Sequence, residues 1–274
     1  MKETNNNNKY LVEFNSIEEF YKYIKETPIN DAFLEKKLAG DLESERNGSR
    51  FSGTESFDEA VSLLKNGDKD IAKKLTQKIK AKSIGIEHAK NAITTYDVCG
   101  YQASVPRYLQ GVPTNMINKR MVMQKQKVIV INKDVGYAAR IKKEQIIEES
   151  VKAFEIIKKI EAQGIRVVLN VIWGVSELVE AKGKSIVCKI RVKSANERLN
   201  ISKMAFIMCH PSMLRRILFR FEETYPEFTS LFTFGYGYPM KEHNKEFCKN
   251  EYFLPALMGN VNIENVNDMN VFKA

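Results

Sequence analysis

The sequence predicts an α/β fold with a central, mostly parallel sheet flanked by helices, together with a helical and irregular N-terminal region. Between about residues 121 and 240, short apolar runs typical of buried strands alternate with long amphipathic helical patterns. The earlier part of the chain combines short helical patterns with a segment rich in glycine, proline and tyrosine. The chain has 274 residues, of which 43% are hydrophobic, enough for one large core or two unequal ones.

Residues 1–50 are predicted to be a helical region that begins with a disordered stretch. A run of four asparagines near the start favours a mobile tail. The first helix is expected over residues 16–26, because Ser16 can cap it and two glutamates stand in its first turn. A second helix is expected over residues 30–40, and a polar stretch with an Asn-Gly turn follows it.

Residues 51–120 are predicted to be a helical and loop-rich segment that packs on the core. One helix should begin after Ser56 and end at Gly67, and a lysine-rich helix should then run to about residue 82. Residues 91–118 contain two glycines, two prolines and three tyrosines, which is typical of a tight ordered connection. Such a connection can serve either as a packing clamp or as a functional loop.

Residues 121–274 are predicted to be the α/β core with a C-terminal extension. The run Val128–Ile131 is typical of a buried strand, residues 142–164 form a long amphipathic helix, and residues 165–174 form a second apolar strand. This strand–helix–strand unit should be parallel and right-handed. The remaining expected elements are a strand with alternating apolar and mostly basic residues over 184–194, a helical region over 200–224, a short strand within 229–239 and a short helix at the C-terminal end.

The charge balance indicates an anionic partner. The formal net charge is +9 and the pI about 9.2, so nucleic acid, phosphate or an acidic protein are all open as partners. No apolar run reaches the roughly 18 residues of a membrane helix, so no membrane association is expected. The start of the chain lacks an apolar signal core and the four cysteines are scattered, which favours reduced thiols in a cytoplasm and no zinc site.

The common catalytic motifs are absent from the sequence. It contains no phosphate-binding GxxxxGK[ST] or GxGxxG loop and no GxSxG nucleophile turn. After the first core strand, Asn132 and Asp134 supply too few oxygens for a divalent cation, so we expect neither a metal nor a cofactor. An enzyme would need carboxylates that meet only in three dimensions.

The stretch MCHPSMLRRILFRFEE, residues 208–223, holds the most conspicuous candidate site. Pro211 interrupts one helix and suits the first turn of the next, so a structural role is favoured for His210 and Pro211. Arg216 and Arg220 lie one turn apart, either as an anion-gripping pair or as surface charges paired with nearby glutamates. Together with Arg107 and Arg140 they are the candidate anion- or nucleic-acid-binding residues.

Four segments together resemble a family of proteins of unassigned activity encoded by tailed bacteriophages and prophages. These segments are FSGTESFDEAVSLLKNG (51–67), SVPRYLQGVPTNM (104–116), the strand–helix–strand from VIVINKDVGY to GIRVVLNVIW, and HPSMLRRILFRFEE (210–223). The order of elements is similar to a von Willebrand A-like α/β core. The metal-dependent adhesion site of that fold uses Asp-x-Ser-x-Ser, whereas this chain reads Asn132-Lys-Asp134-Val-Gly136 and lacks the serines.

We therefore expect a non-enzymatic phage or prophage protein of the bacterial host cytoplasm. It would bind a macromolecular partner, either protein or nucleic acid, through a basic α/β domain, in an oligomeric state that the sequence leaves open. The alternative is a nucleic-acid-processing enzyme or accessory factor. Binding predicts one continuous positive surface formed by the four arginines, whereas catalysis predicts that Asp134 meets other carboxylates in a pocket.

Overall fold

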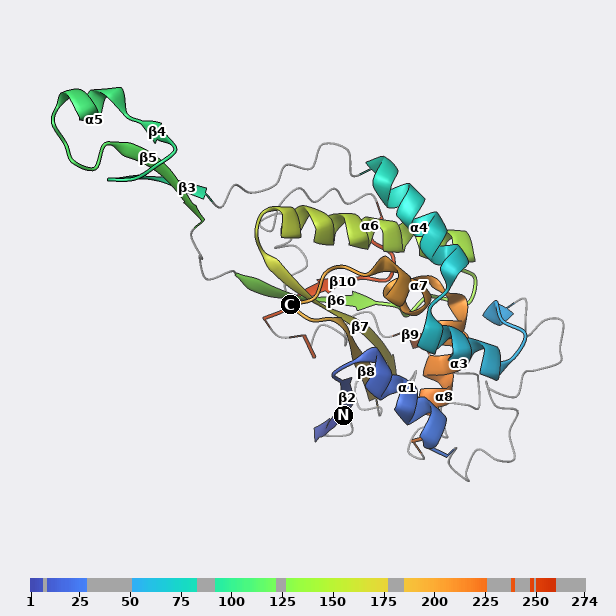
Figure 1. The fold of residues 1–274 in the computed structure, drawn as a ribbon. Coiled ribbons are helices and arrows are strands. Elements are labelled where there is room, and N and C mark those ends of the chain that lie inside the picture. Colours follow the sequence, from blue (N-terminus) through green and yellow to red (C-terminus); the bar gives the residue numbers. More distant parts are fainter. Residues whose placement is uncertain are drawn as a thin grey trace.

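The central sheet of the protein is mixed and carries helices against it (Figure 1). The computed structural model describes residues 1–6, 9–28, 51–82, 92–121, 127–176, 185–225, 238–239, 247–248 and 250–259. Along the strand order β1-β2-β8-β7-β6-β10, three of the five neighbouring pairs are parallel, namely β2–β8, β7–β6 and β6–β10. The predicted α/β class with a mostly parallel sheet is therefore confirmed.

The predicted strand–helix–strand unit is present and parallel. It consists of β6 (Val128–Asp134), α6 (Lys143–Ala162) and β7 (Arg166–Ser176), with Val130 opposite Val168 in the ladder. Helix α6 ends before Gly164, whose positive φ of 82° suits a residue without a side chain. Strand β8 (Ser185–Lys193) pairs with β7 in the antiparallel direction.

The described helices outside residues 92–121 pack against one face of this sheet. Alternate residues of β8, such as Ile186 and Ile190, share one apolar core with α6 and with four further helices. These helices are α1 (Ile17–Glu26), α3 (Phe57–Asn66), α4 (Lys69–Lys82) and α7 (Ile201–Cys209). The opposite face has a separate small apolar cluster of Ile172, Val187, Cys248 and Phe253, to which no described helix contributes.

The capping serines behave as the sequence predicts. Ser16 Oγ accepts the backbone N–H of Glu19 at 3.0 Å, and Ser56 Oγ accepts that of Glu59 at 3.1 Å. Each bond satisfies one of the free N–H groups at a helix start. The starts of α1 and α3 are confirmed, and Gly67 ends α3 with a φ of 78°.

The prediction of a disordered start is wrong for the described N-terminal residues. Residues Lys2–Asn6 form β1 and Lys9–Phe14 form β2, and β2 lies parallel to β8. The reason is the alternation within β2, which buries Val12 and Phe14 in the core and leaves Glu13 on the other face. Strand β1 is polar, and it is held by its antiparallel ladder to β2.

The helical region predicted over residues 200–224 is divided by His210. Helix α7 ends at Cys209, where His210 adopts extended backbone angles of −93° and 130°. After Pro211 the chain continues as π-helix η2 (Met213–Leu218) and α8 (Phe219–Glu222). The predicted restart at Pro211 is confirmed, whereas the wider π-helical turn is a feature that the sequence did not indicate.

Residues 92–121 form a second sheet instead of a connection packed on the core. This sheet has the strand order β3-β5-β4 and stands apart from the central sheet (Figure 1). Its elements are β3 (Ala92–Asp97), β4 (Gln102–Ala103), α5 (Val105–Leu109) and β5 (Met116–Met121). We call residues 92–121 the arm. Of the segment predicted to pack on the core, described residues of 51–82 do so, whereas none of the arm residues 94–118 belongs to the core.

Some predicted elements lie outside the described residues. These are the helix over 30–40, most of the strand expected within 229–239 and the helix at the C-terminal end. Only Tyr238–Pro239 of the second is described, as strand β9, which pairs with β7.

Candidate functional site

Arg216 is enclosed beneath residues 51–55 and only 1% of its surface is exposed. Its Nε donates to Ser52 Oγ at 3.1 Å, and its Nη2 donates to the carbonyl oxygens of Thr54 and Glu55 at 2.9 and 3.2 Å. The planar guanidinium presents several donors in fixed directions, which suits an array of carbonyl oxygens. The charge of Arg216 therefore holds the segment before α3 against η2.

Neighbouring residues of η2 complete this attachment. Arg215 donates through Nη2 to the carbonyl oxygens of Ala139 and Ile141, each at 3.0 Å. Ser212 Oγ donates to the carbonyl oxygen of Ser52 at 2.7 Å and lies 2.8 Å from Thr54 Oγ1. The segment before α3 and the start of η2, far apart in the sequence, are thus bound to each other inside the fold.

The four candidate arginines do not form one surface. Arg220 lies 4.5 Å from the centre of the Phe57 ring and pairs with Glu223 at 3.1 Å, so it also packs within the fold. Arg140 is exposed in the turn after β6, and Arg107 belongs to the arm. The continuous positive surface expected from the sequence is therefore not present, because two of its members are enclosed.

His210 is a buried neutral histidine in the same region. Its Nδ1 accepts the backbone N–H of Ser212 at 3.0 Å, and its ring stacks on Phe206 with centroids 5.2 Å apart. The pKa of His210 is lowered from 6.5 to about 4, mainly by burial and also by the charge of Lys143, while Asp68 opposes the shift. The predicted structural role agrees with this environment, since a proton would have to be accepted inside the core.

We expect His210 to make the fold less stable in mild acid. Because the folded-state pKa lies below the unfolded one, its contribution is fully present above pH 6.5 and is lost as the pH falls toward 4. Relative to His210→Gln, the wild-type chain should lose about 2–3 kcal/mol more unfolding free energy between pH 7 and 4.5. Denaturant titrations at both pH values measure this difference, and parallel pH profiles for the two chains would show that His210 is not the titrating group.

The arm has a defined backbone geometry. Tyr101 N–H donates to the Ile117 carbonyl oxygen at 3.0 Å, and a Cβ at Gly100 would stand 2.2 Å from that same oxygen. Glycine is thus required where the chain crosses β5. Arg107 stacks on the Tyr96 ring, with its Cζ 4.2 Å from the ring centre, and so fixes α5 over β3.

The arm exposes most of its large apolar side chains. Val105 is 63% exposed, Tyr108 67% and Leu109 78%, and Tyr96, Val98 and Tyr101 are also exposed. Six of the ten exposed large hydrophobic residues of the described chain belong to this one segment. The sequence marked Arg107 and Tyr108 as part of a structured loop, but the exposure of Tyr108 reflects that no described element covers it, which a sequence pattern does not show.

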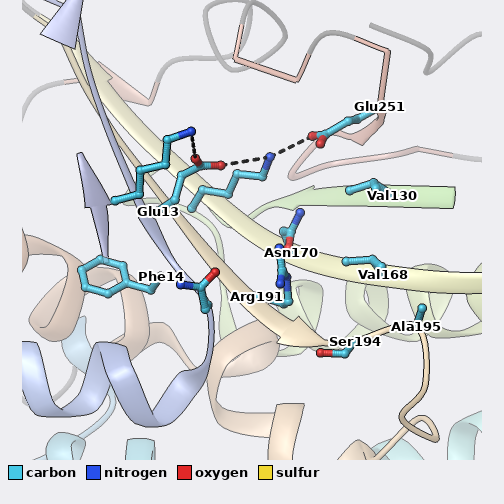
Figure 2. A pocket seen from close by; sticks show the side chains of 12 residues that line it. Glu13, Phe14, Val130, Val168, Asn170, Arg191, Ser194, Ala195 and Glu251 are labelled. Carbon is cyan, nitrogen blue, oxygen red and sulfur yellow. Dashed lines mark hydrogen bonds and ion pairs between the residues drawn. The ribbon is translucent and has the colours of Figure 1, made fainter. Parts of the chain in front are cut away.

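A polar cavity of about 460 Å³ lies on the face of the central sheet opposite the helices (Figure 2). A chain of contacts through the buried Asn132 joins two of its lining residues: Asn170 Nδ2 donates to Asn132 Oδ1 at 2.9 Å, and Asn132 Nδ2 donates to Glu251 Oε2 at 2.7 Å. Lys189 Nζ donates to the same Glu251 oxygen at 2.9 Å and lies 3.6 Å from Glu13. The alternation of β8 predicted the outward basic residues, but not the carboxylates that meet them.

Asp134 is buried at the end of β6 and is not among the residues that line the cavity. Its Oδ1 accepts the backbone N–H of Gly136 at 2.7 Å and so shapes the turn after β6. Among the described residues, no three His, Cys, Asp or Glu side chains are grouped to hold a metal ion. None of the described helices is both long and apolar enough to cross a membrane.

Comparison with known proteins identifies one family. Residues 2–273 match the family described as a domain of unknown function (DUF7192). No curated protein and no solved structure matches the chain.

Proposed function

The chain belongs to the DUF7192 family, a domain of unknown function, and on that premise we propose that it is a non-enzymatic protein that binds a protein partner through the arm. The observation that carries this proposal is the lack of burial within the arm. Among its residues 94–118, none is buried, although a regular three-stranded ladder runs through them.

A sheet of this kind normally needs an apolar face covered by other residues. Isolated small sheets are marginally stable in water, because the area that they bury does not offset the ordering of the chain. Contiguous exposed apolar patches are uncommon on monomeric proteins and mark interaction sites. A partner that covers Val105, Tyr108 and Leu109 would supply the missing burial.

The charge of the arm favours a protein over a nucleic acid. The arm has one acidic residue, Asp97, and three basic ones, Arg107, Lys119 and Arg120, and its residues 94–118 are neutral despite the +9 of the whole chain. Nucleic-acid binding relies on several cations that neutralise phosphates. Exposed valine and leucine beside tyrosine and arginine instead suit an apolar pocket on a protein, where tyrosine and arginine are frequent energetic anchors.

The biological setting is part of the same proposal. A phage or prophage protein in the host cytoplasm is supported by the resemblance of the four segments, one of which, residues 104–116, lies in the arm. A von Willebrand A-like core is supported by the parallel β6-α6-β7 unit.

Site-specific cross-linking tests the proposal. A photoreactive residue in place of Leu109 should cross-link to one discrete protein in cells that express the chain, whereas the same residue at Leu257 should not. Leu257 is a matched control because it is exposed by 47% but lies outside the arm. With the purified partner, the double variant Tyr108→Ser and Leu109→Ser should bind at least about thirtyfold more weakly, as expected for anchor residues.

Two results would contradict the proposal. The first is a partner that binds the arm variant as tightly as the wild-type chain, or that binds Leu257→Ser as weakly as the arm variant. The other is binding of single- or double-stranded DNA or RNA that depends on the arm and falls steeply across a salt series. The second result would keep the arm as the binding site and replace its protein partner by nucleic acid.

A further inference from the structure

The cavity on the sheet face opposite the described helices has charged groups of both signs that can still bind a ligand. Arg191 stands opposite Asn170 in the β7–β8 ladder and lines the cavity, and no partner for its guanidinium is found among the described residues. On the other side, Glu251 binds Asn132 and Lys189 through Oε2 alone, and Glu13 is held by ion pairs of 3.6 and 3.8 Å. Carboxylate oxygens there can accept further hydrogen bonds.

The two kinds of group are close enough for one small molecule. Lys189 and Arg191 are two residues apart on one strand, which places their side chains on the same face roughly 7 Å apart. Glu13 stands directly opposite Lys189 on the neighbouring strand. The guanidinium of Arg191 and the carboxylates of Glu13 and Glu251 therefore line the same cavity, which Figure 2 shows, and one small molecule can contact both.

The remaining lining combines apolar side chains with uncharged polar ones, and the size is that of a ligand site. Val130, Val168 and Ala195 line one side of the cavity. Its volume of about 460 Å³ falls in the range of small-molecule pockets, roughly 300–1,000 Å³. Three cations and two carboxylates line it, namely Lys2, Lys189, Arg191, Glu13 and Glu251, so neither a multiply charged anion nor a simple cation matches it.

We propose that this cavity binds a small zwitterion, a free amino acid, with its carboxylate on Arg191 and its ammonium group on Glu13 and Glu251. The apolar side chain of the ligand lies against Val130 and Val168. The network of Asn170, Asn132 and Lys189 holds Glu251 in place before the ligand arrives, which reduces the entropy lost on binding. This site is independent of the arm and of its partner.

Ligand-detected NMR and calorimetry with the full chain test this proposal. The probes are the twenty protein amino acids, and for the best binder its analogues without the amino group and without the carboxyl group. At least one amino acid should bind saturably, and each analogue should bind at least tenfold more weakly. Arg191→Met should weaken binding at least tenfold, whereas Arg198→Met, at an exposed position outside the cavity lining, should leave it unchanged.

Other outcomes overturn the proposal. No saturable binding by any amino acid would remove it. Equal binding of the analogue without the amino group, or competition by inorganic phosphate, would identify a plain anion site. If the Arg191→Met variant had the thermal unfolding midpoint of the wild type and bound the amino acid with unchanged affinity, the ligand would bind at another site.

Discussion

Replacement of Arg216 by methionine is expected to lower the unfolding free energy by roughly 3–5 kcal/mol. The change removes a charged donor from Ser52 Oγ and from the carbonyl oxygens of Thr54 and Glu55, and the acceptors on Ser52 and Thr54 are buried. A hydrogen bond to a charged group contributes about 1.5–3 kcal/mol, and an unsatisfied buried acceptor adds a desolvation cost. Chemical denaturation of the purified variant measures the loss.

Arg140→Met is the matched control for this substitution. Both arginines are candidate anion-binding residues on sequence grounds, but Arg140 is exposed. Its replacement should change stability by less than about 0.5 kcal/mol. If the two variants were equally stable, Arg216 would not fasten residues 51–55, and its charge would again be available for a ligand.

Phe221→Ala is expected to lower stability by about 3–5 kcal/mol. The ring is fully buried and lies between the rings of Phe14, Phe20, Tyr23 and Tyr225, with centroid distances from 5.3 to 6.3 Å. It thereby joins α8 to β2 and α1. Removal of the ring leaves a cavity that these rigid aromatic neighbours fill poorly, so the cost should lie near the upper end for core truncations.

Val128→Ala provides the comparison for Phe221→Ala. Val128 is half exposed at the start of β6, so its truncation creates no enclosed cavity and should cost about 0.5 kcal/mol or less. A nearly neutral Phe221→Ala would mean that the apolar face of residues 213–221 is not packed as described.

The periodicity of apolar residues was enough to predict those helices and strands whose buried face shows in their own sequence. The stripe of α6 and the apolar runs of β6 and β7 each indicate an element without reference to distant residues. The N-terminal strands show the limit of this reasoning. The alternation of Tyr10, Val12 and Phe14 was available as a strand pattern, but β1 reads as a polar tail because its only support is the ladder to β2.

The candidate site was harder to predict because charge alone does not show where a side chain lies. Arg216 and Arg220 read as surface cations on a helix, and only the long-range contact with residues 51–57 encloses them. Conversely, the arm reads as a packing connection, and its exposure follows from the absence of any described element that covers it. The carboxylates of the polar cavity come from segments more than 200 residues apart.

Hydrogen exchange in the presence of the cross-linked partner, once purified, tests the binding role of the arm most directly. The account predicts that backbone amides of residues 94–118 exchange slowly in the complex and much faster in the free chain, because the partner covers a part of the arm in which no residue is buried in the free chain. Amides of the central strands β6 and β7 should exchange equally in both states. Protection confined to the central sheet or its helices, with the arm unchanged, would contradict the account.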